Sequence, residues 1–204
     1  MSIMRSGIMK FIHLFSGGLD STVLLYDLLD QGAKLHCLLF NYGQRHLKEL
    51  NYAESTCGKL AVPYERLALA PKLFNRSSLT SGKGELSGKP TIVPNRNMVM
   101  ISMAASFALS CGGTAVTWAP NADDAAIYPD CRYDFFKALN EALHICDNRR
   151  MEVHAPYIQR SKRTVVEIGR RLNVPFDETW SCYDNGAEPC GVCGACKVRQ
   201  EALA

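Results

Sequence analysis

The stretch FSGGLDST, residues 15–22, follows an apolar run and leads into a leucine-rich segment with helical spacing. This order of strand, glycine turn and helix is where α/β proteins bind phosphate. The paired glycines Gly17 and Gly18 let the backbone turn tightly, so that amide N–H groups approach phosphate oxygens at the positive end of the helix dipole. Further hydrogen-bond donors are Ser16, Ser21 and Thr22. The stretch therefore predicts an anion-binding loop.

This loop differs from the commonest phosphate-binding motifs. No Lys follows Gly18, the spacing of a Walker A motif is missing, and the glycines do not form GxGxxG. The simplest alternative is an ordinary strand-to-helix turn, against which the hydroxyl groups and Asp20 argue. Because an acidic side chain in a phosphate loop is unfavourable unless it binds a cation or orients another group, Asp20 indicates magnesium.

The alternation of strand and helix patterns continues along the chain. Strands are expected at residues 10–15, 34–40, 64–69 and 114–119, and helices at 22–29, 45–60, 97–109 and 133–146, with Ser161 capping a last helix that runs to 172. This order predicts an α/β fold, a doubly wound and mainly parallel sheet in a single domain over residues 1–204. Residues 71–94, rich in Gly, Ser and Pro, interrupt the pattern and predict a mobile surface loop that acts as a lid.

The composition is that of a folded globular protein, with 47% hydrophobic and 21% charged residues. A formal charge of +3, spread along the chain, does not predict a nucleic-acid surface. No apolar run approaches the ~20 residues of a membrane span, and the first residues lack the features of a signal peptide. We therefore expect a cytoplasmic protein without membrane contact, in which the nine cysteines are reduced.

Four of these cysteines lie close together near the C-terminal end, with the spacing C-x7-C-x2-C-x2-C. They are Cys182, Cys190, Cys193 and Cys196. Four thiolates on short turns can close tetrahedrally around zinc, and a complete sulfur shell leaves no position open for chemistry. The segment 180–197 therefore predicts a structural zinc site. An iron–sulfur cluster with the same ligands and a set of metal-free thiols are the alternatives.

Several separated motifs together resemble one enzyme family. The glycine loop resembles that of the N-type ATP pyrophosphatases, which cleave ATP between the α- and β-phosphates and transfer AMP to a substrate oxygen. The motifs NYGQRH (41–46), VPNRN (93–97), YPDCR (128–132), SK (161–162) and TWSCY (179–183) resemble, in order, the 7-cyano-7-deazaguanine synthases. This resemblance covers nearly the whole chain and implies the fold of the adenine nucleotide alpha-hydrolase-like (HUP) proteins, with zinc in the C-terminal tail.

The resemblance implies an ATP-dependent ligase that forms carbon–nitrogen bonds. Such an enzyme adenylates the carboxylate of 7-carboxy-7-deazaguanine, lets ammonia form the amide, and activates the amide oxygen so that the nitrile 7-cyano-7-deazaguanine (preQ0) is left for queuosine biosynthesis. Its expected partners are Mg-ATP, the deazaguanine acid, ammonia and a second copy of the chain in a homodimer.

The same resemblance, together with residue chemistry, assigns the site. The expected catalytic residues are Asp20, Arg96 and Lys162. The expected ATP- and pyrophosphate-binding residues are Phe15, Ser16, Gly17, Gly18, Leu19, Asp20, Ser21 and Thr22. The expected substrate-binding residues are Gln44, Arg45, His46, Arg96, Asn97, Asp130 and Arg132. Arg96 and Lys162 can balance phosphate or carboxylate charge, and Asp130 can accept the N–H groups of a guanine-like base. The alternative for Arg96 and Lys162 is a solvated surface charge. For Asp130 it is an acidic residue in a turn after a proline.

The residues just before YPDCR depart from the family pattern. Family members usually carry an aromatic residue, Ser and Gly there, whereas this chain has Ala125, Ala126 and Ile127, and Trp118 stands where glycine is common. These replacements leave the amine acceptor open. The alternatives are a relative that joins the adenylated acid to an amine on a protein or nucleic acid partner, a tRNA-modifying enzyme with a related loop, and a metal-binding adaptor without activity.

Overall fold

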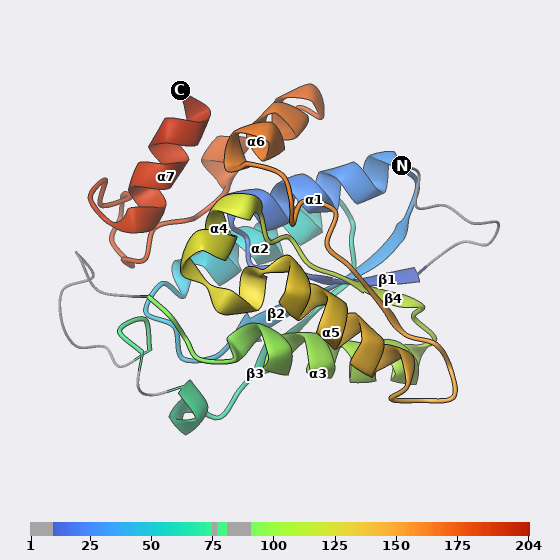
Figure 1. Ribbon diagram of the computed structural model, residues 1–204. Coiled ribbons are helices and arrows are strands. Elements are labelled where there is room, and N and C mark those ends of the chain that lie inside the picture. Colours follow the sequence, from blue (N-terminus) through green and yellow to red (C-terminus); the bar gives the residue numbers. More distant parts are fainter. Residues whose placement is uncertain (1–9, 75–76, 81–90) are drawn as a thin grey trace.

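A computed structural model describes residues 10–74, 77–80 and 91–204, and all structural statements below concern these residues (Figure 1). Its centre is a five-stranded sheet of order β3-β2-β1-β4-β5 in which every pairing is parallel. The strands are β1 (Lys10–Leu14), β2 (Lys34–Asn41), β3 (Tyr64–Ala68), β4 (Ala115–Thr117) and β5 (Glu152–His154). Because the chain moves outward from β1 first in one direction and then in the other, the carboxyl end of β1 is the switch point of the sheet, where α/β proteins bind ligands.

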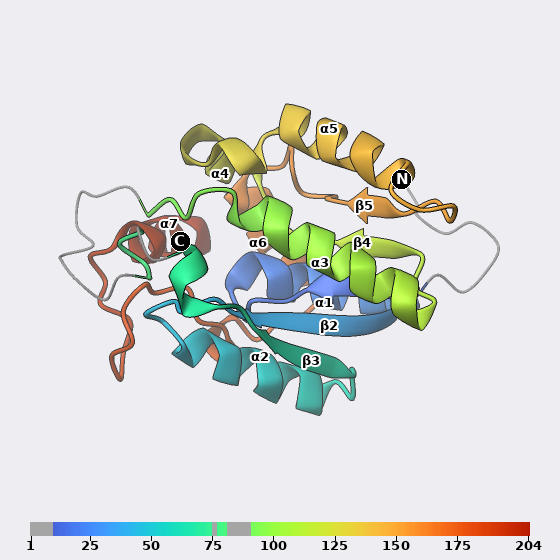
Figure 2. The same cartoon turned by 90° about the horizontal axis from the view of Figure 1, so that it is seen from below.

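Helices cover both faces of this sheet (Figures 1 and 2). They are α1 (Leu19–Asp30), α2 (Lys48–Lys59), α3 (Arg96–Cys111), α4 (Ala122–Ile127), α5 (Tyr133–His144), α6 (Lys162–Arg171) and α7 (Gly194–Leu203), with short 3-10 turns at Pro71–Phe74, Pro129–Cys131 and Phe176–Glu178. Helices α3 and α5 pack on one face, and α1, α2, α6 and α7 on the other. The predicted doubly wound α/β fold is confirmed.

The alternation of side chains along the strands produces two apolar cores. In β1, Ile12 faces the core under α3, whereas Phe11 faces the core under α1 and α6. The neighbouring strand β2 divides in the same way, with Leu38 on the α3 side and Cys37 on the α1 side. Strands buried on both faces read as continuous apolar runs, which is why the sequence pattern located them well.

The structure corrects several predicted boundaries. Helix α1 begins at Leu19 rather than residue 22, and α2 begins at Lys48 rather than residue 45. The later start of α2 has a tertiary cause, because the backbone N–H of Arg45 donates to Leu79 O and that of Lys48 donates to the side chain of Asn185. The sequence analysis also missed the short elements β5, α4 and α7. The predicted cap is confirmed, since Ser161 Oγ accepts the N–H of residue 164 at the start of α6.

The predicted mobile loop 71–94 is only partly described. Residues 75–76 and 81–90 lie outside the described residues, so the central part of that prediction is not tested. The flanking parts pack firmly, because Phe74, Leu79 and Val93 are all buried in the core under α3. No helix within the described ranges combines the length and the apolar character that a bilayer crossing requires.

Candidate active site and metal centre

The glycine loop between β1 and α1 is shaped by one residue that must lack a side chain. Gly17 has a positive φ of 76°, and a Cβ atom there would lie 2.3 Å from the backbone oxygen of Glu49 and 2.9 Å from the nitrogen of Ala53. Only glycine allows this close approach of the loop to α2. The backbone N–H of Trp180 donates to Gly17 O at 3.0 Å, so the C-terminal part of the chain holds the loop from its other side.

Three hydroxyl groups gather at the N-terminus of α1. Ser16 Oγ lies 3.0 Å from Ser21 Oγ, and Ser21 and Thr22 both donate to Gly18 O, at 3.1 and 2.8 Å. Two other predicted nucleotide-binding residues, Phe15 and Leu19, have side chains in the apolar core. They can therefore reach a nucleotide only through their backbone groups.

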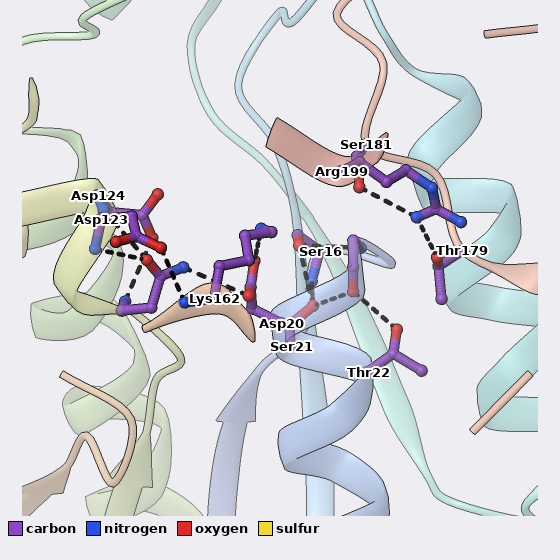
Figure 3. A network of polar contacts seen from close by, with 12 residues as sticks. Ser16, Asp20, Ser21, Thr22, Asp123, Asp124, Lys162, Thr179, Ser181 and Arg199 are labelled. Carbon is purple, nitrogen blue, oxygen red and sulfur yellow. Dashed lines mark hydrogen bonds and ion pairs between the residues drawn. The ribbon is translucent and has the colours of Figure 1, made fainter. Parts of the chain in front are cut away.

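An ion pair joins the loop to the start of α6 (Figure 3). Asp20 Oδ2 lies 2.5 Å from Lys162 Nζ, and Asn121 Nδ2 donates to Asp20 Oδ1 at 3.3 Å. Burial acts to lower the pKa of Lys162, but the carboxylate of Asp20 outweighs this effect, and the net pKa is raised. Lys162 is therefore charged at neutral pH, and the predicted residues Asp20 and Lys162 meet.

Helix α4, which the sequence analysis missed, supports this ion pair. Its first turn is a capping box in which Asn121 Oδ1 accepts the N–H groups of Asp123 and Asp124, while Asp124 Oδ2 accepts the N–H of Asn121. Asp123 Oδ2 in turn accepts the backbone N–H of Lys162 at 2.8 Å. Burial, with Asp20 close by, raises the pKa of Asp124 to about 6. The spacing Asn-x-x-Asp was the available sequence signal for this turn.

The predicted substrate residues meet between α3 and the 3-10 turn at Pro129–Cys131. The backbone N–H of Asn97 donates to Asp130 Oδ2 at 3.2 Å, and Arg96 Nη1 donates to the hydroxyl of Tyr42 at 3.1 Å. Burial acts to lower the pKa of Arg96, but Tyr42 and Asp130 raise it to a net value above the usual range. Arg132 lies apart from them, exposed, with its Nε donating to the carbonyl oxygen of residue 125.

A buried polar cluster lies beneath this surface. Gln44 Oε1 accepts the N–H of Tyr42, and its Nε2 donates to Phe40 O and to Glu49 Oε1. Glu49 also lies 3.4 Å from His46 Nε2. The amide of Gln44 is therefore used inside the fold, where it holds the turn after β2. Glu49, hidden in a helical pattern, was not found from the sequence.

Burial shifts the pKa values of two side chains in this cluster. Burial raises the pKa of Glu49 to about 8, against the opposing effect of its bond from Gln44. Burial, with Arg96 and Arg45 nearby, lowers the pKa of His46 to about 4. At neutral pH the carboxyl group of Glu49 is thus mainly protonated and His46 is neutral. The Nδ1 atom of His46 is buried without a hydrogen-bond partner among the described residues.

Tyrosines connect this cluster to the C-terminal tail. Tyr128 Oη lies 3.1 Å from Tyr183 Oη and 2.6 Å from Thr91 Oγ1, and the ring of Tyr183 lies 5.7 Å from that of His46. The motifs YPDCR and TWSCY, separated by about fifty residues of sequence, thus form one wall of the site.

The four cysteines of the tail form a compact sulfur cluster. The sulfur atoms of Cys182, Cys190, Cys193 and Cys196 all lie within 4.8 Å of one another. A tetrahedral site with zinc–sulfur bonds of about 2.3 Å places its sulfurs about 3.8 Å apart, close to the observed spacing. Cys182 Sγ also accepts two backbone N–H groups at 3.3 Å, from residues 184 and 190, as a thiolate would. The cluster fits a metal ion in both geometry and donor chemistry.

The family comparison agrees with these features. Residues 10–204 match the family model described as queuosine biosynthesis protein QueC. The chain belongs to this family. It is 43% identical to a 7-cyano-7-deazaguanine synthase of Methanoregula boonei, over 96% of this chain and 94% of that protein. It is 41% identical to the synthase of Caldicellulosiruptor saccharolyticus, over 96% and 91% of the two chains, and 40% identical to that of Archaeoglobus fulgidus, over 96% and 86%.

Solved structures that resemble this QueC family member share its fold at low sequence identity. The U34-tRNA thiolase NcsA from Methanococcus maripaludis superposes with a TM-score of 0.60 at 15% identity, covering 98% of this chain and 67% of the other. An NMN synthetase from Francisella tularensis gives 0.55 at 17% identity, and the match spans 85% of this chain but only 65% of the synthetase. These likenesses support the adenine nucleotide hydrolase-like fold. The enzyme class, an ATP-dependent ligase, follows from the family.

Proposed function

We propose that the polar cluster at the carboxyl ends of β1, β2 and β4 is the site where this chain converts 7-carboxy-7-deazaguanine to 7-cyano-7-deazaguanine, with ATP and ammonia. The relatives that match this chain over nearly their full length are named for this activity. The observation that carries the proposal is the glycine loop, in which Gly17 packs against α2 and the N-terminus of α1 lies beside the Asp20–Lys162 ion pair. This arrangement suits the binding of a released pyrophosphate.

We assign the nucleotide chemistry to the loop and α6. The backbone N–H groups of the loop and the hydroxyls of Ser16, Ser21 and Thr22 hold the phosphates that leave as pyrophosphate. Lys162 balances the charge that develops on them, and Asp20 orients Lys162. Magnesium would enter with the ATP substrate, and Asp20 is the carboxylate of the loop that could help to hold it.

The deazaguanine acid is assigned to the wall formed by α3 and the YPDCR motif. Arg96 supplies the charge for the carboxylate to be activated, and Asp130, fixed by the N–H of Asn97, accepts N–H groups of the base. Arg45 and Arg132 are assigned to the outer edge of this wall. Gln44 contributes by fixing the turn that carries His46, since its own amide is used inside the fold.

Nitrile formation requires the removal of protons from nitrogen. Attack of ammonia on the acyl-adenylate releases AMP and a proton. The amide oxygen then takes the adenylyl group of a second ATP, which releases pyrophosphate, and leaves as part of AMP while the nitrogen loses two protons. The pKa of His46, about 4, makes its imidazole too weak a base to take up these protons at neutral pH, so they pass to solvent. We assign His46 to substrate binding, because its neutral ring has an Nδ1 without a hydrogen-bond partner among the described residues.

We assign zinc to the four-cysteine cluster as a structural ion, because a complete shell of four thiolates leaves no position for substrate. A homodimer and a cytoplasmic location remain predictions. Reduced thiols at all nine cysteines suit a reducing compartment, and light scattering of the purified protein measures the oligomeric state.

The proposal is tested by incubating the zinc-loaded protein with ATP, magnesium, ammonia and 7-carboxy-7-deazaguanine, followed by mass measurement of the deazaguanine products. Formation of the nitrile, together with AMP and pyrophosphate, supports it. Failure to form any acyl-adenylate, amide or nitrile contradicts it.

One observation favours a second candidate, a relative that uses another amine. Helix α4 carries Ala125, Ala126 and Ile127 where family members usually have an aromatic residue, Ser and Gly, and Ile127 is 54% exposed beside the YPDCR wall. An apolar surface there suits an acceptor larger than ammonia. In the same assay, a stalled acyl-adenylate or amide that is consumed only when a protein or nucleic acid amine is added supports this candidate.

A further inference from the structure

Helix α7 directs one guanidinium group back toward the glycine loop. Nη1 of Arg199 donates to Thr179 Oγ1 at 2.7 Å and to Ser181 Oγ at 3.4 Å, and Nη2 donates to Phe176 O. These three contacts tie α7 to residues 176–181. A guanidinium carries five N–H donors, so donors remain for a ligand.

The segment that Arg199 holds is the same one that touches the loop. Trp180, which lies between the two hydroxyl partners of Arg199, donates its N–H to Gly17 O at 3.0 Å. A Cβ atom on Gly18 would lie 3.7 Å from Trp180 O. Figure 3 shows the guanidinium on one side of the loop hydroxyls and Lys162 on the other.

The charges of this region act on one another. Burial lowers the pKa of Arg199, and the nearby Cys196 and Asp177 oppose this. The carboxylate of Asp20 acts in the same direction with a smaller effect. Arg199 in turn acts to lower the pKa of Lys162. Two cations thus lie near the N-terminus of α1. Lys162 forms an ion pair with Asp20, whereas Arg199 has no carboxylate within ion-pair distance among the described residues. A multiply charged phosphate ligand would balance the charge of Arg199.

We propose that Arg199 binds the pyrophosphate part of ATP opposite Lys162, and that the four-cysteine centre holds Arg199 in place through α7. The link to the centre is short, because Cys193 caps α7, Cys196 lies in its first turn, and Arg199 follows one turn later. The proposal rests on the proposed function, since it assigns one more residue to the same nucleotide site.

The test compares Arg199→Gln with Arg170→Gln. Arg170, on α6, also donates to α7, at Leu203 O, but it takes no part in the loop contacts. Both variants therefore make the same chemical change: Arg199 lies on α7, and Arg170 donates a hydrogen bond to α7. Calorimetry measures the binding of inorganic pyrophosphate and of AMP to the zinc-loaded full chain, and metal analysis checks the zinc content.

Arg199→Gln is expected to weaken pyrophosphate binding about 10- to 100-fold while AMP binding and zinc content change little, since the lost bonds are charge-assisted. Arg170→Gln is expected to bind both ligands like the wild type. Arg199→Lys should recover part of the pyrophosphate affinity, because lysine restores the positive charge but not the paired N–H donors of a guanidinium. Equal losses for pyrophosphate and AMP, or pyrophosphate binding within about twofold of the wild type, would overturn the assignment of Arg199.

Removal of the metal separates the two parts of the proposal. It is expected to weaken pyrophosphate binding by the wild type and to change that of Arg199→Gln much less, and equal losses in the two proteins would overturn the role of the cysteine centre. A wild type that binds no pyrophosphate at all would instead contradict the proposed function, which the formation of the nitrile tests independently.

Discussion

Asp20 shows how one carboxylate can lie in the proposed phosphate site without repelling the ligand. Its two oxygens are taken by Lys162 at 2.5 Å and by Asn121 at 3.3 Å, so its charge is largely neutralised in the absence of a ligand. The side chains of the ion pair are only 19% and 13% exposed, which keeps the pair little screened by water. A phosphate ligand then meets the ammonium of Lys162 in a fixed position rather than a bare carboxylate.

We therefore predict that Asp20→Asn lowers AMP formation from ATP by about 100-fold or more, because Lys162 loses the group that orients it. The isosteric amide keeps the contact with Asn121 but removes the charge. Zinc content should be unchanged, since the cysteine cluster is made by other residues. Asp30→Asn, at the exposed opposite end of α1, is the matched control and should keep full activity. Turnover retained in Asp20→Asn contradicts the role of this carboxylate.

Glu49 predicts a pH dependence of stability. Its pKa is raised from 4.5 to about 8 in the folded protein, so the folded state keeps a proton that the unfolded state releases. The contribution of this proton to the free energy of unfolding is complete below pH 4.5. It decreases as the pH rises and is lost once the pH has passed 8. His46 acts in the opposite direction, but only between its lowered pKa of about 4 and the ordinary histidine pKa of 6.5. Above pH 6.5 the effect of Glu49 dominates this pair.

Glu49→Gln resembles the protonated carboxyl group and removes the titration. We expect its stability advantage over the wild type in urea unfolding to grow by on the order of 2 kcal/mol between pH 6 and pH 8.5, because the wild type continues to lose stability over this range. Glu54→Gln, on the same helix with a partly exposed side chain, serves as control and should show no such divergence. Unfolding free energies of Glu49→Gln and the wild type that stay parallel from pH 6 to 8.5 would show that Glu49 is ionised throughout.

Site residues could be predicted from the sequence where a residue of suitable chemistry also lay in a recognisable motif. Arg96, Asn97 and Asp130 were predicted to share a site and do lie together. Glu49 and Arg199 were not found, because each sits in a helical segment where a charged residue usually faces solvent. Only the tertiary packing shows that Glu49 is buried against the turn after β2 and that Arg199 bonds to the segment 176–181, which contacts the glycine loop.

Among the elements, the turn between β1 and α1 depends most strictly on one residue. Gly17 and Gly43 both have positive φ, 76° and 83°, but a Cβ at Gly17 would lie 2.3 Å from Glu49 O, whereas nothing lies within 4 Å of one at Gly43. Alanine at Gly43 would therefore cause backbone strain alone, whereas alanine at Gly17 would add steric overlap with α2. Comparing the two variants tests whether the loop is held tightly against α2.

We expect Gly43→Ala to lower the unfolding free energy by roughly 1 kcal/mol, the cost of a left-handed conformation for an L-residue. Gly17→Ala should lower it by roughly 3 kcal/mol or more, since the loop or α2 must also move. Urea unfolding measures both. Equal costs at the two positions would mean that the loop moves away from α2 freely.

The elements that escaped prediction are those whose stability is not local. Strand β5 has only three residues, and it forms because β4 offers a parallel partner with paired residues such as Val116 and Val153. Helix α4 buries no side chain and depends on the Asn121 capping box. Helix α7 starts at a metal-ligand turn. Long apolar runs with regular spacing, in contrast, located β1, β2 and α1 to within a few residues.

On the scale of the whole molecule, the segment with the four cysteines packs against the glycine loop of the proposed active site. It binds the glycine loop through Trp180, and the ring of Trp180 stacks on Tyr52 and lies 4.2 Å below the ammonium of Lys48. Helix α7 adds Ala202 to the core between α1 and α6. The apolar contacts of the segment are centred on Trp180 and the cysteines themselves, so we expect its order to depend on the metal that we assign to them.

Loss of one sulfur ligand is the sharpest test of that dependence. Cys190→Ser should lose bound zinc and lower the Tm by about 10 °C, because a few kcal/mol of metal binding are removed from a chain of this length. Limited proteolysis should then cut first within 180–204, and pyrophosphate binding should weaken with it, since Trp180 and Arg199 lose their support. Cys146→Ser, at an exposed cysteine outside the cluster, is the control and should keep zinc, Tm and binding. If Cys190→Ser instead retains one zinc per chain and the wild-type Tm, the metal is not held by these four sulfurs, and the support of the loop must come from packing alone.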